Sequence, residues 1–93
     1  MVDYEISAGT RATVFGLSME SPIQYEKRFD EPYRIDENKI IDNPNRFKIH
    51  NEMMRTVLEL ASSNRSLCFM EQVCGKFFVV LVPTWKLTEL KGV

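Results

Sequence analysis

The longest uninterrupted apolar run of the chain lies in its C-terminal third and predicts a central β-strand. Residues 77–82 read Phe-Phe-Val-Val-Leu-Val, and Pro83 follows them. Aromatic and β-branched residues favour strands, and successive side chains of a strand point to opposite faces. This strand therefore needs a cover on both faces, which places it in the middle of a sheet and not at an exposed edge.

A second strand is expected just before this run, at 66–73. Apolar side chains occur on both of its faces, with Leu67 and Phe69 on one of them. Gly75 then supplies the positive φ that a tight hairpin turn requires. We therefore expect 66–73 to pair antiparallel with 77–82.

The N-terminal part of the chain alternates between apolar and polar residues, which predicts further strands. These strands are expected at 3–7, 13–19 and 23–29. The last has the clearest alternation, because Ile23, Tyr25 and Phe29 share one face and polar side chains occupy the other. The turn signal Ser21-Pro22 lies between the second and third strands and indicates a hairpin.

Two segments are less regular. Residues 30–43 are rich in acidic side chains and read as a long loop, with a short strand at 33–36 as the alternative. The tail at 84–90 is expected to form a short strand, with a helical turn as the alternative.

The spacing of apolar residues predicts one helix, from Pro44 to Ser62. Asn43 is a favoured N-cap residue, and proline is tolerated at the first helical position. The stripe that recurs at three- and four-residue steps consists of Phe47, His50, Met54, Val57 or Leu58, and Ala61. Asn64 is suited to end the helix, because asparagine tolerates the left-handed conformation.

Together these elements predict a single α+β domain over residues 1–93, in the order β-β-β-α-β-β. An antiparallel sheet of four to five strands carries the one long helix on one face. The other face of 77–82 has no evident cover. Three covers are compatible with the pattern: the sheet curls over itself, Trp85 and the acidic loop fold back, or a second copy buries the face in a homodimer.

Length and composition limit the number of domains and the cellular compartment that we expect for this chain. Its 93 residues suffice for one core and are too few for two. The six-residue apolar run is far shorter than the roughly 20 residues that span a bilayer, and the first residues do not resemble a signal peptide. Cys68 and Cys74 lie about 20 Å apart on an extended strand. We therefore expect free thiols and a cytoplasmic, reducing environment.

Residue types that support catalysis or metal binding are sparse. His50 is the single histidine, and with two cysteines it leaves a zinc ion short of ligands. The four glycines are scattered, so no phosphate-binding loop is present. We expect no catalytic residues, no metal and no cofactor.

The first functional hypothesis is a small, non-enzymatic interaction or regulatory protein that binds another protein, or its own copy. It uses the exposed sheet face and the acidic loop, and its aromatic residues act as anchors of the contact. The residues expected to bind this partner are Tyr25, Phe29, Asp30, Glu31, Tyr33, Asp36, Glu37 and Trp85.

The alternative is a nucleic-acid-binding protein that uses the helix and the basic C-terminal half. Residues 1–43 contain nine acidic and five basic residues, whereas 44–93 contain four acidic and seven basic residues. Basic side chains that follow the helix would contact phosphates. These residues are Arg46, Lys48, Arg55 and Arg65.

Overall fold

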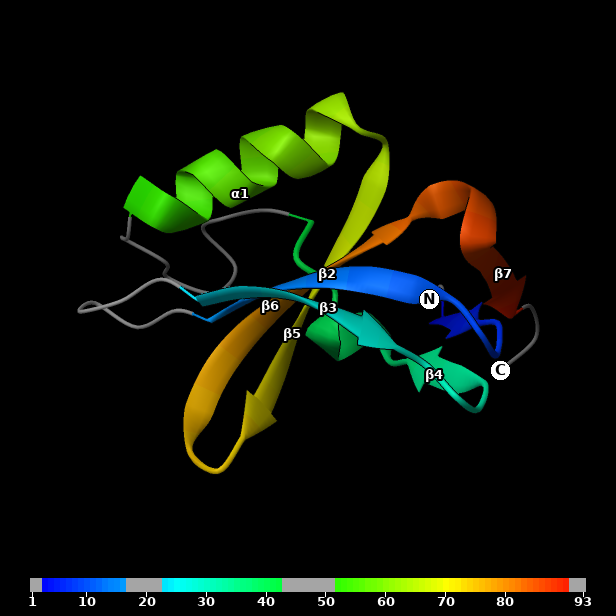
Figure 1. The fold of residues 1–93 in the computed structure, drawn as a ribbon. Helices are drawn as coiled ribbons and strands as arrows, with labels where there is room; N and C mark the ends of the chain where they lie inside the picture. Colours follow the sequence, from blue (N-terminus) through cyan, green and yellow to red (C-terminus); the bar gives the residue numbers. More distant parts are fainter. Residues whose placement is uncertain (1–2, 17–22, 43–51, 91–93) are drawn as a thin grey trace.

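The computed structural model describes residues 3–16, 23–42 and 52–90. Over these residues the chain forms seven strands, one α-helix and two short 3-10 turns (Figure 1). The elements are β1 (Asp3–Ile6), β2 (Arg11–Gly16), β3 (Ile23–Arg28), β4 (Tyr33–Ile35), η1 (Glu37–Lys39), α1 (Glu52–Ser63), β5 (Ser66–Val73), β6 (Lys76–Pro83), η3 (Thr84–Lys86) and β7 (Leu87–Leu90).

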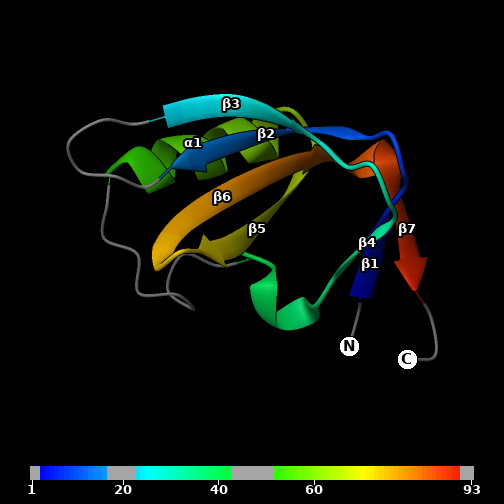
Figure 2. The ribbon, with the colours of Figure 1, turned by 60° about the horizontal axis from the view of Figure 1, so that its bottom comes forward.

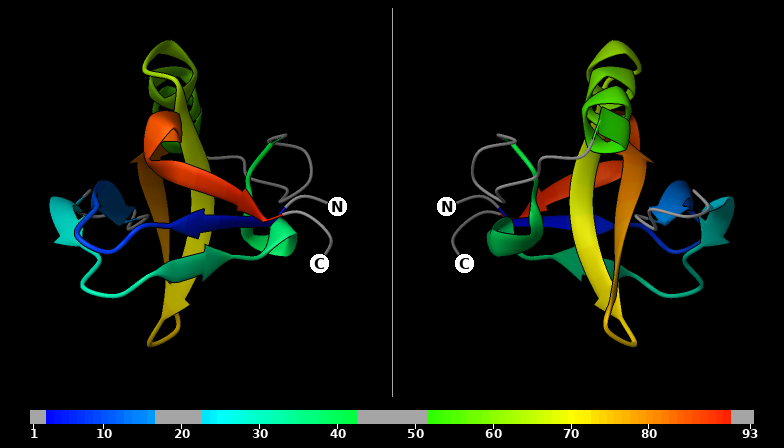
Figure 3. Two further views of the ribbon diagram at one scale, coloured as in Figure 1. Left: turned by 90° about the vertical axis from the view of Figure 1, so that its right-hand side faces the viewer. Right: turned by 90° about the vertical axis from the view of Figure 1, so that its left-hand side faces the viewer.

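The strands form two antiparallel sheets. One has four strands in the order β3-β2-β6-β5, and the other has three in the order β4-β1-β7. The strands of the smaller sheet run crosswise to β5 and β6 (Figures 2 and 3). The α+β class is confirmed, but the expected single sheet of four to five strands is wrong. The acidic loop contains the short strand β4, and the tail contains both a helical turn and a strand.

The two sheets are joined where hydrogen-bonded strands bend together. Gly9 N donates to Phe29 O at 2.6 Å, and Phe29 N donates to Thr10 O at 2.9 Å, so the pairing of β2 with β3 extends into the bend. Gly9 has a φ of 84°, a conformation that residues with a Cβ rarely adopt. The chain therefore passes from β1 to β2, and from β3 to β4, around one shared corner.

Of the three covers that the sequence left open for the second face of 77–82, the structure provides one from within the chain. Val80 and Val82 are fully buried, and they share a core with Ile6 of β1 and Ile35 of β4. Packing of the three-stranded sheet against this face removes the reason to expect a second copy there. Alternation alone cannot show this, because β1, β4 and β7 have only three or four residues each.

On the opposite face of the four-stranded sheet, α1 packs as expected. Met54, Val57 and Ala61 form a second core with Val79 and Leu81. The N-terminal part of the predicted helix, with Asn43, Pro44, Phe47 and His50, lies outside the described residues. The left-handed position after the helix is taken by Arg65, with φ of 50°, and not by Asn64.

The β5–β6 hairpin is formed as predicted. Val73 pairs with Lys76, which leaves Cys74 and Gly75 as a two-residue turn with φ values of 53° and 77°. Positive φ at both central residues is the geometry of a type I′ turn, whose twist matches that of the flanking strands. Cys68 and Cys74 are free thiols, as expected.

Candidate functional site

The two acidic pairs of the predicted loop differ: one is exposed, and the other takes part in hydrogen bonds that hold the fold. Asp30 and Glu31 are exposed, and the Asp30 carboxylate lies 4.0 Å from Arg28 Nε. Asp36 instead caps η1, because its side chain accepts a hydrogen bond from Asn38 N at 2.9 Å. Of the predicted acidic pairs, only the first is therefore fully available to a partner.

Glu37 of the second pair is half-buried and lies beside Asp3 of β1. Its N–H donates to Asp3 Oδ1 at 3.1 Å, and Asp3 Oδ2 accepts from Arg34 Nε at 3.2 Å. The Arg34 guanidinium, together with the Glu37 N–H, holds the pKa of Asp3 below its ordinary value. Glu37 Oε2 is buried without a hydrogen-bond partner within the described ranges.

The predicted aromatic anchors do not all reach the surface. Phe29 is only 4% exposed and belongs to the core, so its expected role as a surface anchor is a wrong prediction. Tyr33 is half-buried, with its ring between Phe29 at 5.3 Å and Phe69 at 5.9 Å, centroid to centroid. Tyr25 and Trp85 are exposed.

Tyr33 lies in a cluster of charged side chains. Lys27 Nζ pairs with Glu71 Oε2 at 3.2 Å, and Lys39 Nζ lies 3.3 Å from the Tyr33 hydroxyl. Burial, followed by a hydrogen bond with Glu71, raises the pKa of Tyr33 above its ordinary value of 10.0. The phenol is therefore protonated at neutral pH and is not activated as a general base.

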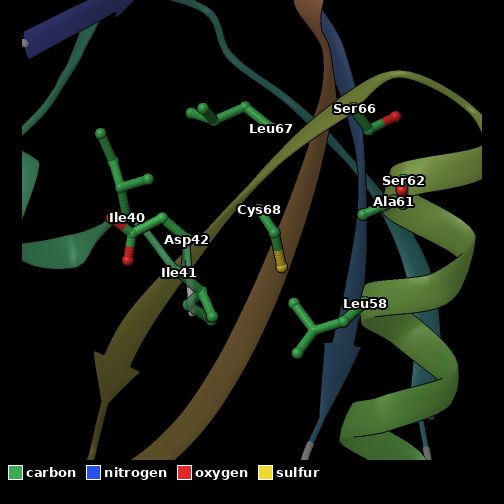
Figure 4. Close-up of a pocket in the computed structure, with 9 residues that line it drawn as sticks. All are labelled: Ile40, Ile41, Asp42, Leu58, Ala61, Ser62, Ser66, Leu67 and Cys68. Carbon is green, nitrogen blue, oxygen red and sulfur yellow. The ribbon is translucent and has the colours of Figure 1, made fainter. Parts of the chain in front are cut away.

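A pocket of about 280 Å³ lies between the C-terminal half of α1, the start of β5 and residues 40–42 (Figure 4). Its lining is mainly apolar and includes Leu58, Ala61 and Cys68. In the close-up the Cys68 side chain points toward Leu58 and α1. Burial raises the pKa of this thiol to about 12, so it is neither a thiolate nucleophile nor a ready metal ligand.

The four-stranded sheet has an open end near the β5–β6 turn. Two large apolar residues are exposed beside this turn, Val73 to 50% and Phe77 to 49%, and Tyr25 on the outer strand β3 is exposed to 44%. The strand register places Tyr25 and Val73 on the same face as half-buried Phe78, and Phe77 on the opposite face. We refer to these four residues as the open sheet end.

The sheet is curled at this end. Lys27 on β3 and Glu71 on β5 form their ion pair across the face, although β3 and β5 are the two outer strands of the sheet. Tyr25 and Val73 are the next residues on the same face of these two strands, beyond the ion pair. Tyr25 and Val73 therefore both lie on the face toward which the sheet curls.

A different surface lies at the other end of β6. Thr84 N and Thr84 Oγ1 both donate to Arg65 O, at 3.0 and 2.8 Å, which fixes η3 against the residue before β5. Trp85 is 75% exposed, and Lys86 Nζ lies 4.5 Å from its ring centroid. We refer to Arg65, Trp85 and Lys86 as the basic corner.

The structure therefore distributes four of the eight predicted partner-binding residues over three places. Tyr25 belongs to the open sheet end, Trp85 to the basic corner, and Asp30 and Glu31 to the turn beyond the opposite end of β3. Of the residues predicted to contact nucleic acid, Arg55 and Arg65 are exposed, whereas Arg46 and Lys48 lie outside the described residues. Val73 and Phe77 were missed as surface residues; their sequence signal was their position beside a two-residue turn.

Further observations limit the chemistry of the molecule. Among the residues that the structure places, no group of three or more His, Cys, Asp or Glu side chains is arranged to hold a metal ion. Nor does any helix in these ranges combine the length and apolar character needed to cross a bilayer. Comparison with family models, curated proteins and solved structures gave no match to this chain.

Proposed function

We propose that the chain is a non-enzymatic interaction protein that docks a protein partner on the open sheet end. The observation that carries this proposal is the exposure of Tyr25, Val73 and Phe77, each close to half, on one sheet. Clustered exposed apolar side chains are typical of interaction surfaces, and aromatic residues commonly supply the energetic centre of such contacts.

Charge complements this apolar surface. The Lys27–Glu71 ion pair borders it on one side, and Lys76 follows the turn on the other. A polar rim around an apolar centre is the usual arrangement of a reversible protein interface. Asp30 and Glu31 lie beyond the far end of β3, so they extend the contact only to a partner that reaches along this strand.

Cys74 provides a site for attaching a chemical probe that tests this proposal. It is an exposed thiol between Val73 and Gly75, while Cys68 is buried. A maleimide photo-crosslinker attached to Cys74 is expected to form an adduct with the partner in extracts of the source cells. Mass spectrometry identifies that partner, and an adduct of two chains identifies self-association.

Matched variants decide whether the open sheet end makes the contact. The double variant Tyr25→Ser with Phe77→Ser is expected to lose the adduct. Leu60→Ser, which changes a residue 42% exposed on α1, is expected to keep it. Equal adduct yields from both variants, or no adduct from the wild type, would overturn the proposal.

The acidic turn is tested separately by charge reversal at Asp30 and Glu31. If these carboxylates contribute, the Lys variants lower the adduct yield without lowering the melting temperature. Asp36 and Glu37 are unsuitable for this test. One caps η1 and the other is partly buried, so their substitution changes the fold as well as the surface.

A further inference from the structure

The basic corner combines a flat aromatic surface with positive charge. Trp85 is the most exposed large apolar residue among those described, at 75%. Lys86 lies over its ring at 4.5 Å, an arrangement that a cation and an indole adopt favourably. Since most of the ring remains open, the indole is available for stacking by a second planar group.

The backbone holds this corner in place. Two hydrogen bonds from Thr84 to Arg65 O tie the residue before Trp85 to the residue before β5. Arg65 also has a φ of 50°, in the region where glycine is usual after a helix. An arginine at this position adds an exposed cation next to η3 at a conformational cost.

The cations of the corner lack acidic partners within the described part of the chain. The three ion pairs there are Lys27–Glu71, Arg28–Asp30 and Arg34–Asp3, and none of them involves Arg65 or Lys86. Two uncompensated cations favour an anionic partner, and an exposed indole favours a partner with flat rings. Single-stranded nucleic acid supplies both, as phosphates and unstacked bases.

We propose that the basic corner binds single-stranded nucleic acid, with a base stacked on Trp85 and phosphates contacted by Arg65 and Lys86. This site lies at the opposite end of β6 from the open sheet end. The two proposals therefore stand on different residues, and failure of one leaves the other unchanged. The nucleic acid would be bound through stacking and backbone charge, so little sequence preference is expected.

The chain contains one tryptophan, so its fluorescence reports directly on Trp85. An oligothymidylate of about 12 nucleotides is expected to quench this emission. The quenching should weaken as salt is raised from about 50 mM to about 200 mM, because counterions compete for the phosphates. A duplex of the same length is expected to compete poorly, since its bases are already stacked.

Variants separate stacking from charge, with binding followed by anisotropy of a labelled oligothymidylate. Trp85→Ala is expected to weaken binding about 5- to 140-fold, the loss of one stacked base. Arg65→Gly removes a cation and relieves the positive φ, so it should lower affinity while keeping or raising the melting temperature. It should also reduce the slope of log affinity against log salt by about 0.7.

Control substitutions complete the design. Arg65→Lys keeps the charge and should retain the salt dependence, and Lys76→Gln removes an exposed cation at the open sheet end and should leave binding unchanged. The proposal is overturned if oligothymidylate gives no signal at low salt, or if Trp85→Ala and Lys76→Gln bind equally well. It is also overturned if polyglutamate or vesicles with phosphatidylserine quench Trp85 and oligothymidylate does not.

Discussion

The β5–β6 hairpin has a covered half and an open half, although both are built from similar apolar residues. In the covered half, Val79, Val80 and Val82 are fully buried. In the open half, Val73 and Phe77 are about half exposed. The difference does not come from residue type. It arises because α1 covers only the buried half of the hairpin on one face, and the three-stranded sheet covers only that half on the other face.

This comparison separates residues that stabilise the fold from residues that are available for binding. Burial of an apolar side chain during folding stabilises the folded state. An apolar side chain that stays exposed can instead stabilise a complex, when a partner covers it. The binding role that we propose for the open half would therefore cost the fold little stability. Three stability measurements test this distinction.

The largest effect is expected for Phe69→Ala in the covered half. Phe69 is fully buried and stacks near Tyr33, so truncation should lower the free energy of unfolding by about 3–5 kcal/mol in urea titrations. If this variant does not fold, Phe69→Leu provides a milder test. Phe77→Ser in the open half should change stability by no more than about 0.5 kcal/mol. Equal losses in the two halves would show that Phe77 is buried in solution.

A gain of about 0.5–1 kcal/mol is expected for Cys74→Asn at the turn that ends the open half. Asparagine tolerates the positive φ of this position better than cysteine does. Gly75→Ala is the opposite control. A Cβ there meets no atom within 4 Å, so any loss of stability reports the backbone conformation alone. Thermal unfolding measures both variants, and a destabilised Cys74→Asn would contradict the type I′ turn.

The smallest effect is expected for Asp3→Asn in the sheet that covers the hairpin. The pKa of Asp3 is lowered by Arg34 and by the Glu37 N–H, so its ionised form stabilises the fold above its unfolded pKa of about 3.9. That contribution is lost as the pH falls through the lower, folded pKa. The difference in unfolding free energy between wild type and variant should be constant at neutral pH and shrink in acid. A difference independent of pH would show that the carboxylate is not paired with Arg34.

Local patterns in the sequence were sufficient to predict the elements whose main contacts join residues close together in the chain. The β5–β6 hairpin follows from two apolar runs separated by a turn that contains Gly75, and β3 follows from its period of two. The helical stripe around Met54, Val57 and Ala61 is likewise a local signal, and the structure packs it against the sheet. The free state of both cysteines also followed from their spacing.

The candidate surfaces could not be predicted from local sequence patterns to the same extent. Phe29 and Tyr25 occupy equivalent positions in the alternation over residues 23–29, yet one is buried and the other is exposed. Their difference depends on β4, β1 and Tyr33, which meet Phe29 only after the chain has bent at Gly9. The basic corner likewise joins Arg65 to Thr84 across 19 positions of sequence.

The sequence by itself determined β3, the β5–β6 hairpin and the helical stripe of α1, because those elements depend on side-chain periodicity and on turn residues within a few positions. Only the tertiary structure decided that a second sheet covers Val80 and Val82, and that one end of β6 is apolar and exposed while the other is basic. Such outcomes depend on contacts between distant segments, and many long-range arrangements satisfy the same local pattern.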